Sequence, residues 1–258
     1  MQTDLPPVIM VHGAFCGGWA FEAFRKPFEA AGHLVLTPDL RGHGEGERSD
    51  AVVGVSMTDY ARDIAALCKA QARPPILVGH SLGGLVAQLA ARRAEVSAVV
   101  LLAPSAPWGV SGSSMEEAVT AFGLHMLGPF WAQAVTPDRS LMRQYSLNRM
   151  PKAQREAVVE RLRPESGRAL WETLNWWLDP FMTTGVGAGP LPASTLVLCG
   201  DRDVVHPPGT VRQTAERIGA EFRLKPGMSH WLLGEPGWDG VADEILAWLD
   251  EVPARDAA

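Results

Sequence analysis

The chain has 258 residues, of which 47% are hydrophobic and 20% are charged. A chain of this size and apolar content can bury one large core and can carry a smaller subdomain beside it. Its net charge of −6 argues against nucleic acid as a partner, because proteins that bind nucleic acid usually present a basic surface.

The N-terminus and the cysteines indicate where the protein works. The opening residues, 1–7, contain no basic start and no apolar stretch, so no secretory signal is expected. No run along the chain reaches the apolar length that a membrane span requires. Cys16, Cys68 and Cys199 are odd in number and widely spaced, which is typical of free thiols in a reducing compartment. We therefore expect a cytoplasmic protein that does not contact a membrane.

Short apolar runs alternate with longer helical patterns along most of the chain. Strands are predicted at 8–11, 34–36, 76–78, 98–102, 196–198 and 221–224. Runs that are apolar on both faces are typical of parallel strands that helices cover on both sides. Helices are predicted at 19–31, 59–70, 84–93 and 239–250. The alternation indicates an α/β fold with a doubly wound, mostly parallel sheet of about six strands.

One region, 108–190, interrupts this alternation and shows no convincing strand. Its pattern predicts helices at 114–127, 138–147, 152–163 and 165–178. The region holds five of the nine tryptophans, namely Trp108, Trp131, Trp171, Trp176 and Trp177. We interpret it as a helical lid inserted into a core formed by 1–107 and 191–258. The aromatic side chains fit two roles, the wall of an apolar pocket and the lid's own small core, and the sequence does not separate them.

The stretch Gly79-His80-Ser81-Leu82-Gly83 has the pattern G-x-S-x-G between a predicted strand and a predicted helix. A tight turn between strand and helix strains the backbone of the serine, and the flanking glycines remove side chains that would clash there. The turn also pushes the serine hydroxyl clear of the sheet, beside the unpaired N–H groups of the helix N-terminus. Ser81 is therefore the predicted nucleophile.

A serine nucleophile needs a base that takes its proton and an acid that orients the base. His230 lies in a loop after the strand at 221–224, and catalytic residues of such sheets gather at the carboxyl ends of strands. The loop after 196–198 offers two acids, Asp201 and Asp203, and the chemistry of the residues allows either one.

A tetrahedral oxyanion needs two backbone donors. Leu82, directly after the nucleophile, supplies one N–H, and Ala14 in the glycine-rich loop after the first strand is the candidate for the other. No cluster of histidine, cysteine and carboxylate has the spacing of a metal site. Neither a metal nor a cofactor is expected.

Four features of the sequence together resemble the α/β-hydrolase superfamily, and the resemblance covers nearly the whole chain. They are the G-x-S-x-G stretch, the His12-Gly13 loop, the Asp39-Leu40-Arg41-Gly42-His43-Gly44 stretch, and Gly200-x-x-Asp203 followed later by a histidine. The resemblance implies Ser81 as nucleophile, Asp203 rather than Asp201 as the orienting acid and His230 as general base. It also implies Ala14 and Leu82 as oxyanion donors and a lid at 108–190.

The opening stretch 11–19 is similar to the branch that contains small esterases and hydroxynitrile lyases. Hydroxynitrile lyases of that branch have a lysine directly after the catalytic histidine, whereas this chain has Trp231, so cyanohydrin cleavage is not expected. Haloalkane dehalogenases and epoxide hydrolases use an aspartate at the position of Ser81, so both activities are disfavoured.

The resulting hypothesis is a serine hydrolase that cleaves a small, mostly hydrophobic carboxylic ester through an acyl-enzyme intermediate. A lactonase, a thioesterase, a C–C bond hydrolase and a cofactor-free perhydrolase would use the same three residues, because one scaffold serves many reactions. A non-catalytic ligand receptor on the same scaffold is an alternative from a different class. The sequence leaves the oligomeric state open.

Overall fold

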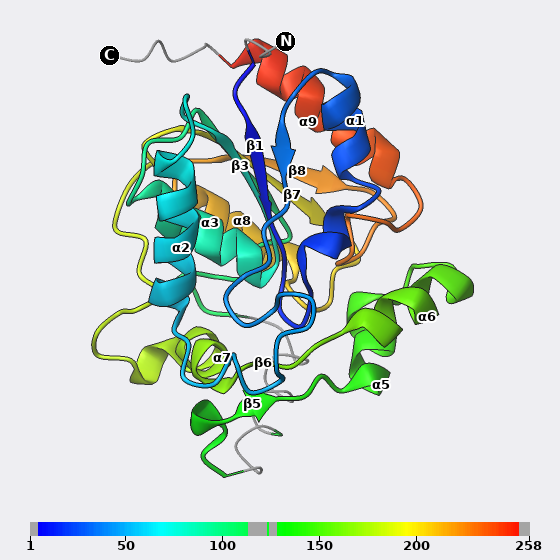
Figure 1. Cartoon of the computed structure of the whole chain (residues 1–258). Coiled ribbons are helices and arrows are strands. Elements are labelled where there is room, and N and C mark those ends of the chain that lie inside the picture. Colours follow the sequence, from blue (N-terminus) through cyan, green and yellow to red (C-terminus); the bar gives the residue numbers. More distant parts are fainter. Residues whose placement is uncertain (1–4, 113–122, 124–127, 253–258) are drawn as a thin grey trace.

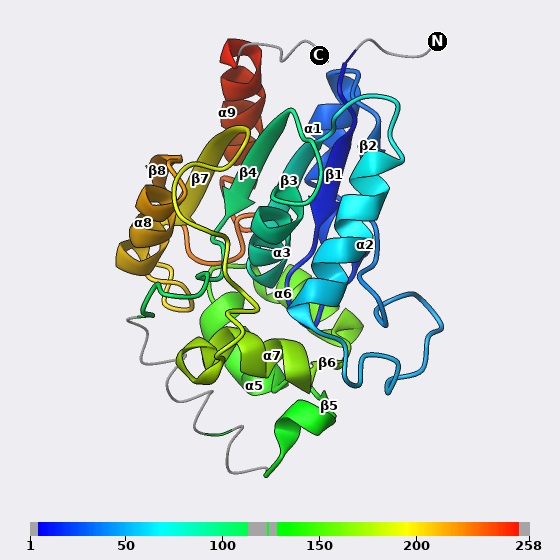
Figure 2. The same cartoon turned by 90° about the vertical axis from the view of Figure 1, so that its left-hand side faces the viewer.

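The computed structural model describes residues 5–112, 123 and 128–252. Its main sheet has six strands in the order β2-β1-β3-β4-β7-β8 (Figures 1 and 2). They are β1 (Val8–Val11), β2 (Val35–Leu36), β3 (Ile76–His80), β4 (Ala98–Leu102), β7 (Ser194–Gly200) and β8 (Glu221–Lys225). Each strand pairs with its neighbours in parallel. The α/β class and the six predicted strands are confirmed.

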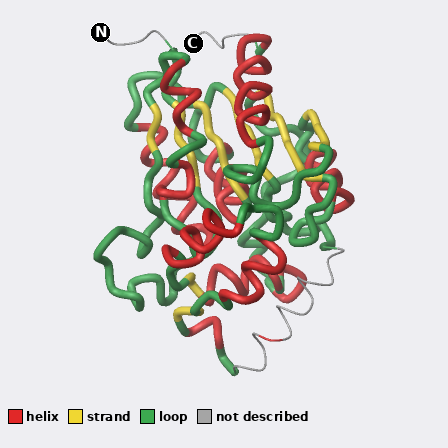
Figure 3. The backbone as a smooth tube through the Cα atoms, turned by 90° about the vertical axis from the view of Figure 1, so that its right-hand side faces the viewer, coloured by secondary structure: helices red, strands yellow, loops and turns green. Residues whose placement is uncertain are grey.

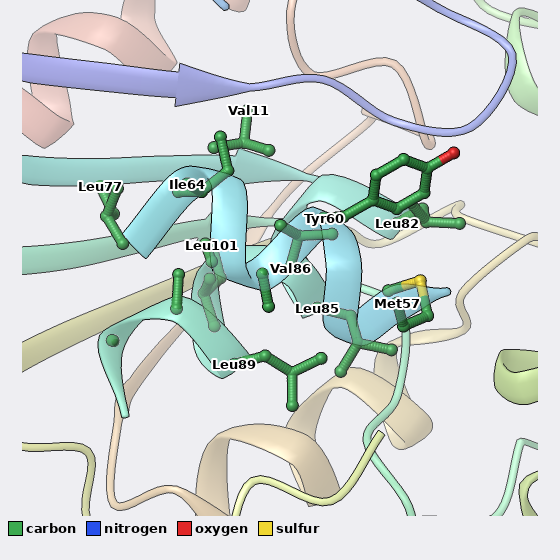
Figure 4. Packing of buried hydrophobic residues seen from close by; sticks show 14 of the residues in the cluster. Val11, Met57, Tyr60, Ile64, Leu77, Leu82, Leu85, Val86, Leu89 and Leu101 are labelled. Carbon is green, nitrogen blue, oxygen red and sulfur yellow. The ribbon is translucent and has the colours of Figure 1, made fainter. Parts of the chain in front are cut away.

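Helices cover both faces of this sheet (Figure 2). One face carries α2 (Met57–Lys69), α3 (Leu82–Ala91) and α8 (Pro208–Arg217), and the other carries α1 (Arg25–Ala30) and α9 (Trp238–Glu251). Side chains alternate along each strand, so Ile9 of β1 belongs to the core on the α2–α3 side while Met10 belongs to the core on the α1–α9 side. Figure 4 shows Tyr60 and Ile64 of α2 in the first of these cores.

The helix predicted over 19–31 is interrupted. The structure has a 3₁₀ helix, η1 (Gly18–Phe21), followed after a short gap by α1. Pro27 has no N–H and therefore fits only the first turn of a helix, where the N–H groups have no partner in the helix. Accordingly α1 begins at Arg25, two residues before this proline.

Between β4 and β7 the chain forms a separate layer at the carboxyl ends of the strands (Figures 1 and 3). Its elements are η2 (Phe130–Ala132), β5 (Ala134–Val135), α5 (Arg139–Leu141), η3 (Met142–Ser146), α6 (Lys152–Arg161), β6 (Glu165–Ser166), α7 (Gly167–Leu174) and η4 (Trp176–Leu178). The helix predicted at 152–163 corresponds to α6, and that at 138–147 to α5 and the π-helix η3. The helix predicted at 114–127 lies, apart from Gly123, outside the described residues.

The prediction that this layer contains no strand is wrong. Glu165 and Ser166 form β6, which pairs antiparallel with Ala134 and Val135 of β5. The helix predicted from 165 therefore begins only at Gly167. Strands of two residues are too short to show the alternation of apolar and polar side chains that identifies a strand in a sequence.

The helices are too short or too polar to cross a bilayer, as far as the structure describes the chain.

Candidate active site

Ser81 occupies the turn that joins β3 to α3. Its backbone has φ 53° and ψ −123°, a conformation that residues other than glycine rarely adopt. Three hydrogen bonds hold it: Ser81 N–H donates to the carbonyl of Leu102 at 3.0 Å, and the Ser81 carbonyl accepts from the N–H groups of Gly84 at 2.9 Å and Ser105 at 3.0 Å. A strained residue persists only where its surroundings fix it in this way.

The two glycines of the turn are required by close backbone contacts. A Cβ atom at Gly79 would lie 2.4 Å from the carbonyl oxygen of Gly83, and one at Gly83 would lie 2.2 Å from the carbonyl oxygen of Val11. Neither distance is compatible with a side chain, because such contacts are far inside van der Waals separation. These glycines therefore let β3, α3 and the end of β1 meet closely around Ser81.

Ser81, His230 and Asp203 come together at the carboxyl ends of three strands. Nε2 of His230 lies 3.1 Å from Oγ of Ser81, and Nδ1 of His230 lies 2.9 Å from Oδ2 of Asp203. The other oxygen of Asp203 accepts from the backbone N–H groups of Val205 and His206, each at 2.9 Å. His230 and Asp203 are both buried.

The charge of Asp203 follows from its partners. Burial alone would raise the pKa of this carboxyl, but the facing His230, followed by the charge and the backbone N–H of His206, holds its pKa below the ordinary value. An ionised Asp203 accepts a hydrogen bond from Nδ1–H of His230. The lone pair on Nε2 of this ring is then directed at Ser81. The arrangement can therefore move the proton of the Ser81 hydroxyl.

The second acid of the same loop is placed differently. Asp201 is exposed and its Oδ1 accepts from the N–H of Gly227 at 2.7 Å. Of the two carboxylates that the sequence left open, the structure brings Asp203 to His230.

The candidate oxyanion donors flank the nucleophile. Leu82 is the first residue of α3, so its N–H has no acceptor within the helix. On the other side, a Cβ atom at Gly13 would lie 3.1 Å from Cβ of Ser81, which shows how closely the loop after β1 approaches. Ala14 follows Gly13 in this loop.

His12 orients the peptide that contains the N–H of Ala14. Nε2 of His12 accepts from the N–H of Leu40 at 2.9 Å, so the proton is on Nδ1, which lies 2.9 Å from the carbonyl oxygen of Gly13. Burial, with a smaller contribution from His43, lowers the pKa of His12 to about 4 and keeps the ring neutral. In a trans peptide the N–H points opposite to the C=O, so fixing the Gly13 carbonyl also directs the N–H of Ala14.

Several residues near His230 escaped the sequence analysis. Nε2 of His206 lies 3.0 Å from Oγ of Ser105, and the His206 ring meets the His230 ring edge-on with centroids 5.1 Å apart. Glu235 accepts from the N–H of Ser229 at 2.9 Å, directly beside the histidine. His206 stands three positions after Asp203, and that short spacing was the signal available for it.

The structure places no group of three or more histidine, cysteine, aspartate or glutamate side chains where they could hold a metal ion, within the ranges it describes.

The alpha/beta hydrolase family matches this chain over residues 8–244. A monoacylglycerol lipase of Mycolicibacterium smegmatis is 27% identical over 261 residues, which cover 94% of this chain and 87% of the lipase. The methylesterase MES16 from Arabidopsis has a similar structure, with a TM-score of 0.71 at 19% identity over 96% of this chain and 100% of that one. A pyrethroid hydrolase from Sphingobium faniae JZ-2 gives 0.70 at 22% identity over 95% and 97%. The match covers almost the whole chain, including the six-stranded sheet and the turn at Ser81. The chain therefore belongs to the alpha/beta hydrolase family.

Proposed function

We propose that this protein is a serine hydrolase that cleaves carboxylic esters through an acyl-enzyme intermediate. The observation that carries the proposal is the unbroken chain of contacts from Oγ of Ser81 through the His230 ring to Asp203, with distances of 3.1 and 2.9 Å. Groups in hydrogen-bond contact in this order are what nucleophilic acyl transfer requires.

In the first step Oγ of Ser81 attacks the ester carbonyl carbon while Nε2 of His230 takes the hydroxyl proton. The carbonyl oxygen becomes an oxyanion, which the N–H groups of Ala14 and Leu82 stabilise. Asp203 stabilises the imidazolium that forms. His230 then returns the proton to the leaving alkoxide, and the alcohol departs from the acyl-Ser81 ester.

In the second step His230 takes a proton from water, and the resulting hydroxide attacks the acyl carbon. The tetrahedral intermediate collapses, Oγ of Ser81 leaves and recovers the proton from His230, and the carboxylic acid is released. The two steps need only the substrate and water.

We further propose that residues 108–190 form a lid over a core of 1–107 and 191–258, and that the substrate is a small, mostly hydrophobic ester. The layer at the strand ends is rich in aromatic side chains, and Trp108 meets Trp176 edge-on with ring centroids 5.5 Å apart. Ester cleavage is also supported by the similar proteins, which are a monoacylglycerol lipase, a methylesterase and a pyrethroid hydrolase.

A fluorophosphonate probe together with a substrate panel tests this function. The probe phosphonylates an activated serine, so we expect it to label Ser81 in the wild type and to leave Ser81→Ala unlabelled. On p-nitrophenyl esters of increasing acyl length, lactones and acyl thioesters, we expect the highest kcat/KM for an ester. Faster cleavage of a lactone or a thioester would replace the ester assignment. A wild type that neither reacts with the probe nor turns over any substrate would contradict the proposal and favour a non-catalytic ligand receptor.

A further inference from the structure

A buried carboxylate joins the 108–190 segment to the loop that carries Ala14. Glu165 of β6 is 0% exposed. Its Oε1 accepts from the hydroxyl of Tyr60 at 2.7 Å and from the N–H of Ser166 at 2.7 Å. Its Oε2 lies 3.2 Å from Nε2 of His43 and 3.4 Å from the backbone nitrogen of Phe15. One side chain thus contacts α2, the loop after β2 and the loop after β1.

Glu165 and His43 form an ion pair inside the protein. Burial opposes the charge of each group, but each partner outweighs it, so the pKa of Glu165 lies below its ordinary value and that of His43 above it. The other ring nitrogen of His43 lies 3.3 Å from the carbonyl oxygen of Arg41, so both nitrogens face acceptors. A buried ion pair adds little net stability, because removing both charges from water offsets their attraction. The role of this carboxylate therefore lies in the backbone that it holds in place.

The backbone that it holds is strained. Phe15 has φ 64°, in the left-handed region that non-glycine residues avoid. Its N–H faces Oε2 of Glu165, and its carbonyl accepts from the N–H of Arg163 at 2.9 Å. Both backbone groups of Phe15 are therefore bound by residues two positions apart on the 108–190 segment. Phe15 directly follows Ala14, so this clamp fixes the peptide next to the candidate donor.

We propose that Glu165 is a positioning residue of the oxyanion site, which clamps the loop at Phe15 and thereby sets the direction of the Ala14 N–H. This inference rests on the proposed function. The position of the Ala14 N–H then depends on how the 108–190 segment packs against the core. The link is one carboxylate that contacts His43, Tyr60 and Phe15. In Figure 4 the Tyr60 hydroxyl points away from the other labelled side chains of the core. Glu165, which that figure does not draw, accepts from this hydroxyl at 2.7 Å.

Glu165→Gln tests the clamp with almost no change in volume. The amide oxygen can keep the contacts with Tyr60 and Ser166, whereas the amide nitrogen then faces the N–H of Phe15, which leaves a donor opposite a donor. A neutral His43 can still accept from this amide at Nε2, so the loss falls on the contact with Phe15. Glu172→Gln is the matched control. Glu172 of α7 is also buried and also ties the 108–190 segment to α2, through Ser56 Oγ at 2.9 Å and the N–H of Met57 at 2.8 Å, but it does not reach the loop at Phe15.

Two measurements are made on both variants: steady-state hydrolysis of a p-nitrophenyl ester and hydrogen–deuterium exchange of peptides that cover 12–18. For Glu165→Gln we expect kcat to fall about tenfold to a hundredfold with KM little changed. A donor displaced by a fraction of an ångström stabilises the transition state less, whereas binding of the substrate is hardly affected. Exchange in 12–18 should become faster. The control should change neither quantity.

Equal kcat and equal exchange in the two variants would overturn the proposal, as would a rise in KM alone. If the wild type hydrolyses no ester, the proposed function has failed and the exchange of 12–18 decides about the clamp by itself. If Glu165→Gln does not fold, Tyr60→Phe replaces it, because this variant removes one 2.7 Å bond to the carboxylate and leaves its charge. Faster exchange in 12–18 then supports the clamp, and unchanged exchange contradicts it.

Discussion

Asp203 and His230 lie on the loops that follow the neighbouring strands β7 and β8, and Oδ2 of the aspartate contacts Nδ1 of the histidine at 2.9 Å. Asp203→Asn would place an amide where the proton on Nδ1 needs an acceptor and would favour the wrong tautomer. We expect kcat to fall by about 10³- to 10⁴-fold while the fold is retained. Stopped-flow or steady-state assays on the best p-nitrophenyl ester measure the loss.

Asp201→Asn is the control for this prediction, because its carboxylate accepts from Gly227 and does not face the histidine. Its kcat should stay within about threefold of the wild type, the range expected of a surface change away from the reacting groups. An equal or larger loss in Asp201→Asn would contradict the assignment of Asp203 as the orienting acid.

Gly83→Ala should destabilise the protein, because the new methyl group would lie 2.2 Å from the carbonyl oxygen of Val11. We expect a loss of about 1–3 kcal/mol or more in the free energy of unfolding, measured by urea denaturation. Gly240 in α9 is the matched position, since no atom lies within 4 Å of a Cβ added there. Gly240→Ala should stabilise by about 0.5–1 kcal/mol. Equal urea midpoints for the two variants would show that the close contact at Gly83 is not required.

Glu235 makes the stability of the protein depend on pH. Burial raises its pKa from 4.5 to about 7, and the nearby Asp203 contributes in the same direction. Between these two values the folded chain keeps a proton that the unfolded chain has lost, so the free energy of unfolding falls as the pH rises and levels off above about 7. Glu235→Gln removes this titration and retains an oxygen for the N–H of Ser229.

We therefore expect Glu235→Gln to raise Tm relative to the wild type more at about pH 8 than at about pH 5. Differential scanning calorimetry at the two pH values gives both differences. The same Tm difference at both would mean that the pKa of Glu235 is ordinary.

The three cysteines should be unreactive in the folded protein. All are buried and free, and burial raises the pKa of each thiol, in Cys68 to about 12. Because the thiolate is the reactive form, the native protein should not react with a chromogenic disulfide reagent, and the unfolded protein should release three equivalents. Rapid labelling of Cys16 in the native protein would contradict its burial in the loop that carries Ala14.

The sequence predicted the central sheet because its signal is local. Runs such as Val8–Val11 and Ala98–Leu102 are apolar at every position, since helices cover both faces of each strand. The break at 22–24 precedes Pro27, a residue that fits only the first turn of a helix, but the apolar pattern over 19–31 predicts one continuous helix. The pairing of β5 with β6 was not predictable, because two-residue strands carry no periodicity and depend on contacts between distant parts of the chain.

The site divides in the same way. Ser81 and His230 could be located because Ser81 directly follows a recognisable strand and His230 lies in the loop after another. Asp201 and Asp203 are two positions apart in one loop, and only the course of that turn decides which faces the histidine. The contact of Glu165 with Phe15 joins residues 150 positions apart, and Glu165 belongs to no motif. Contacts of this kind arise from the folded arrangement, so the residues themselves give no sign of them.

β4 and β7 are direct neighbours in the sheet, paired from Ala98–Ser194 to Leu102–Leu198, although the whole 108–190 segment separates them along the chain. An excursion that departs from one strand and returns to the adjacent one can lengthen, shorten or change its sequence without shifting the register of either. This arrangement divides the chain into two parts. The sheet and its loops hold Ser81, Asp203 and His230 in place, while the 108–190 segment can change without moving them.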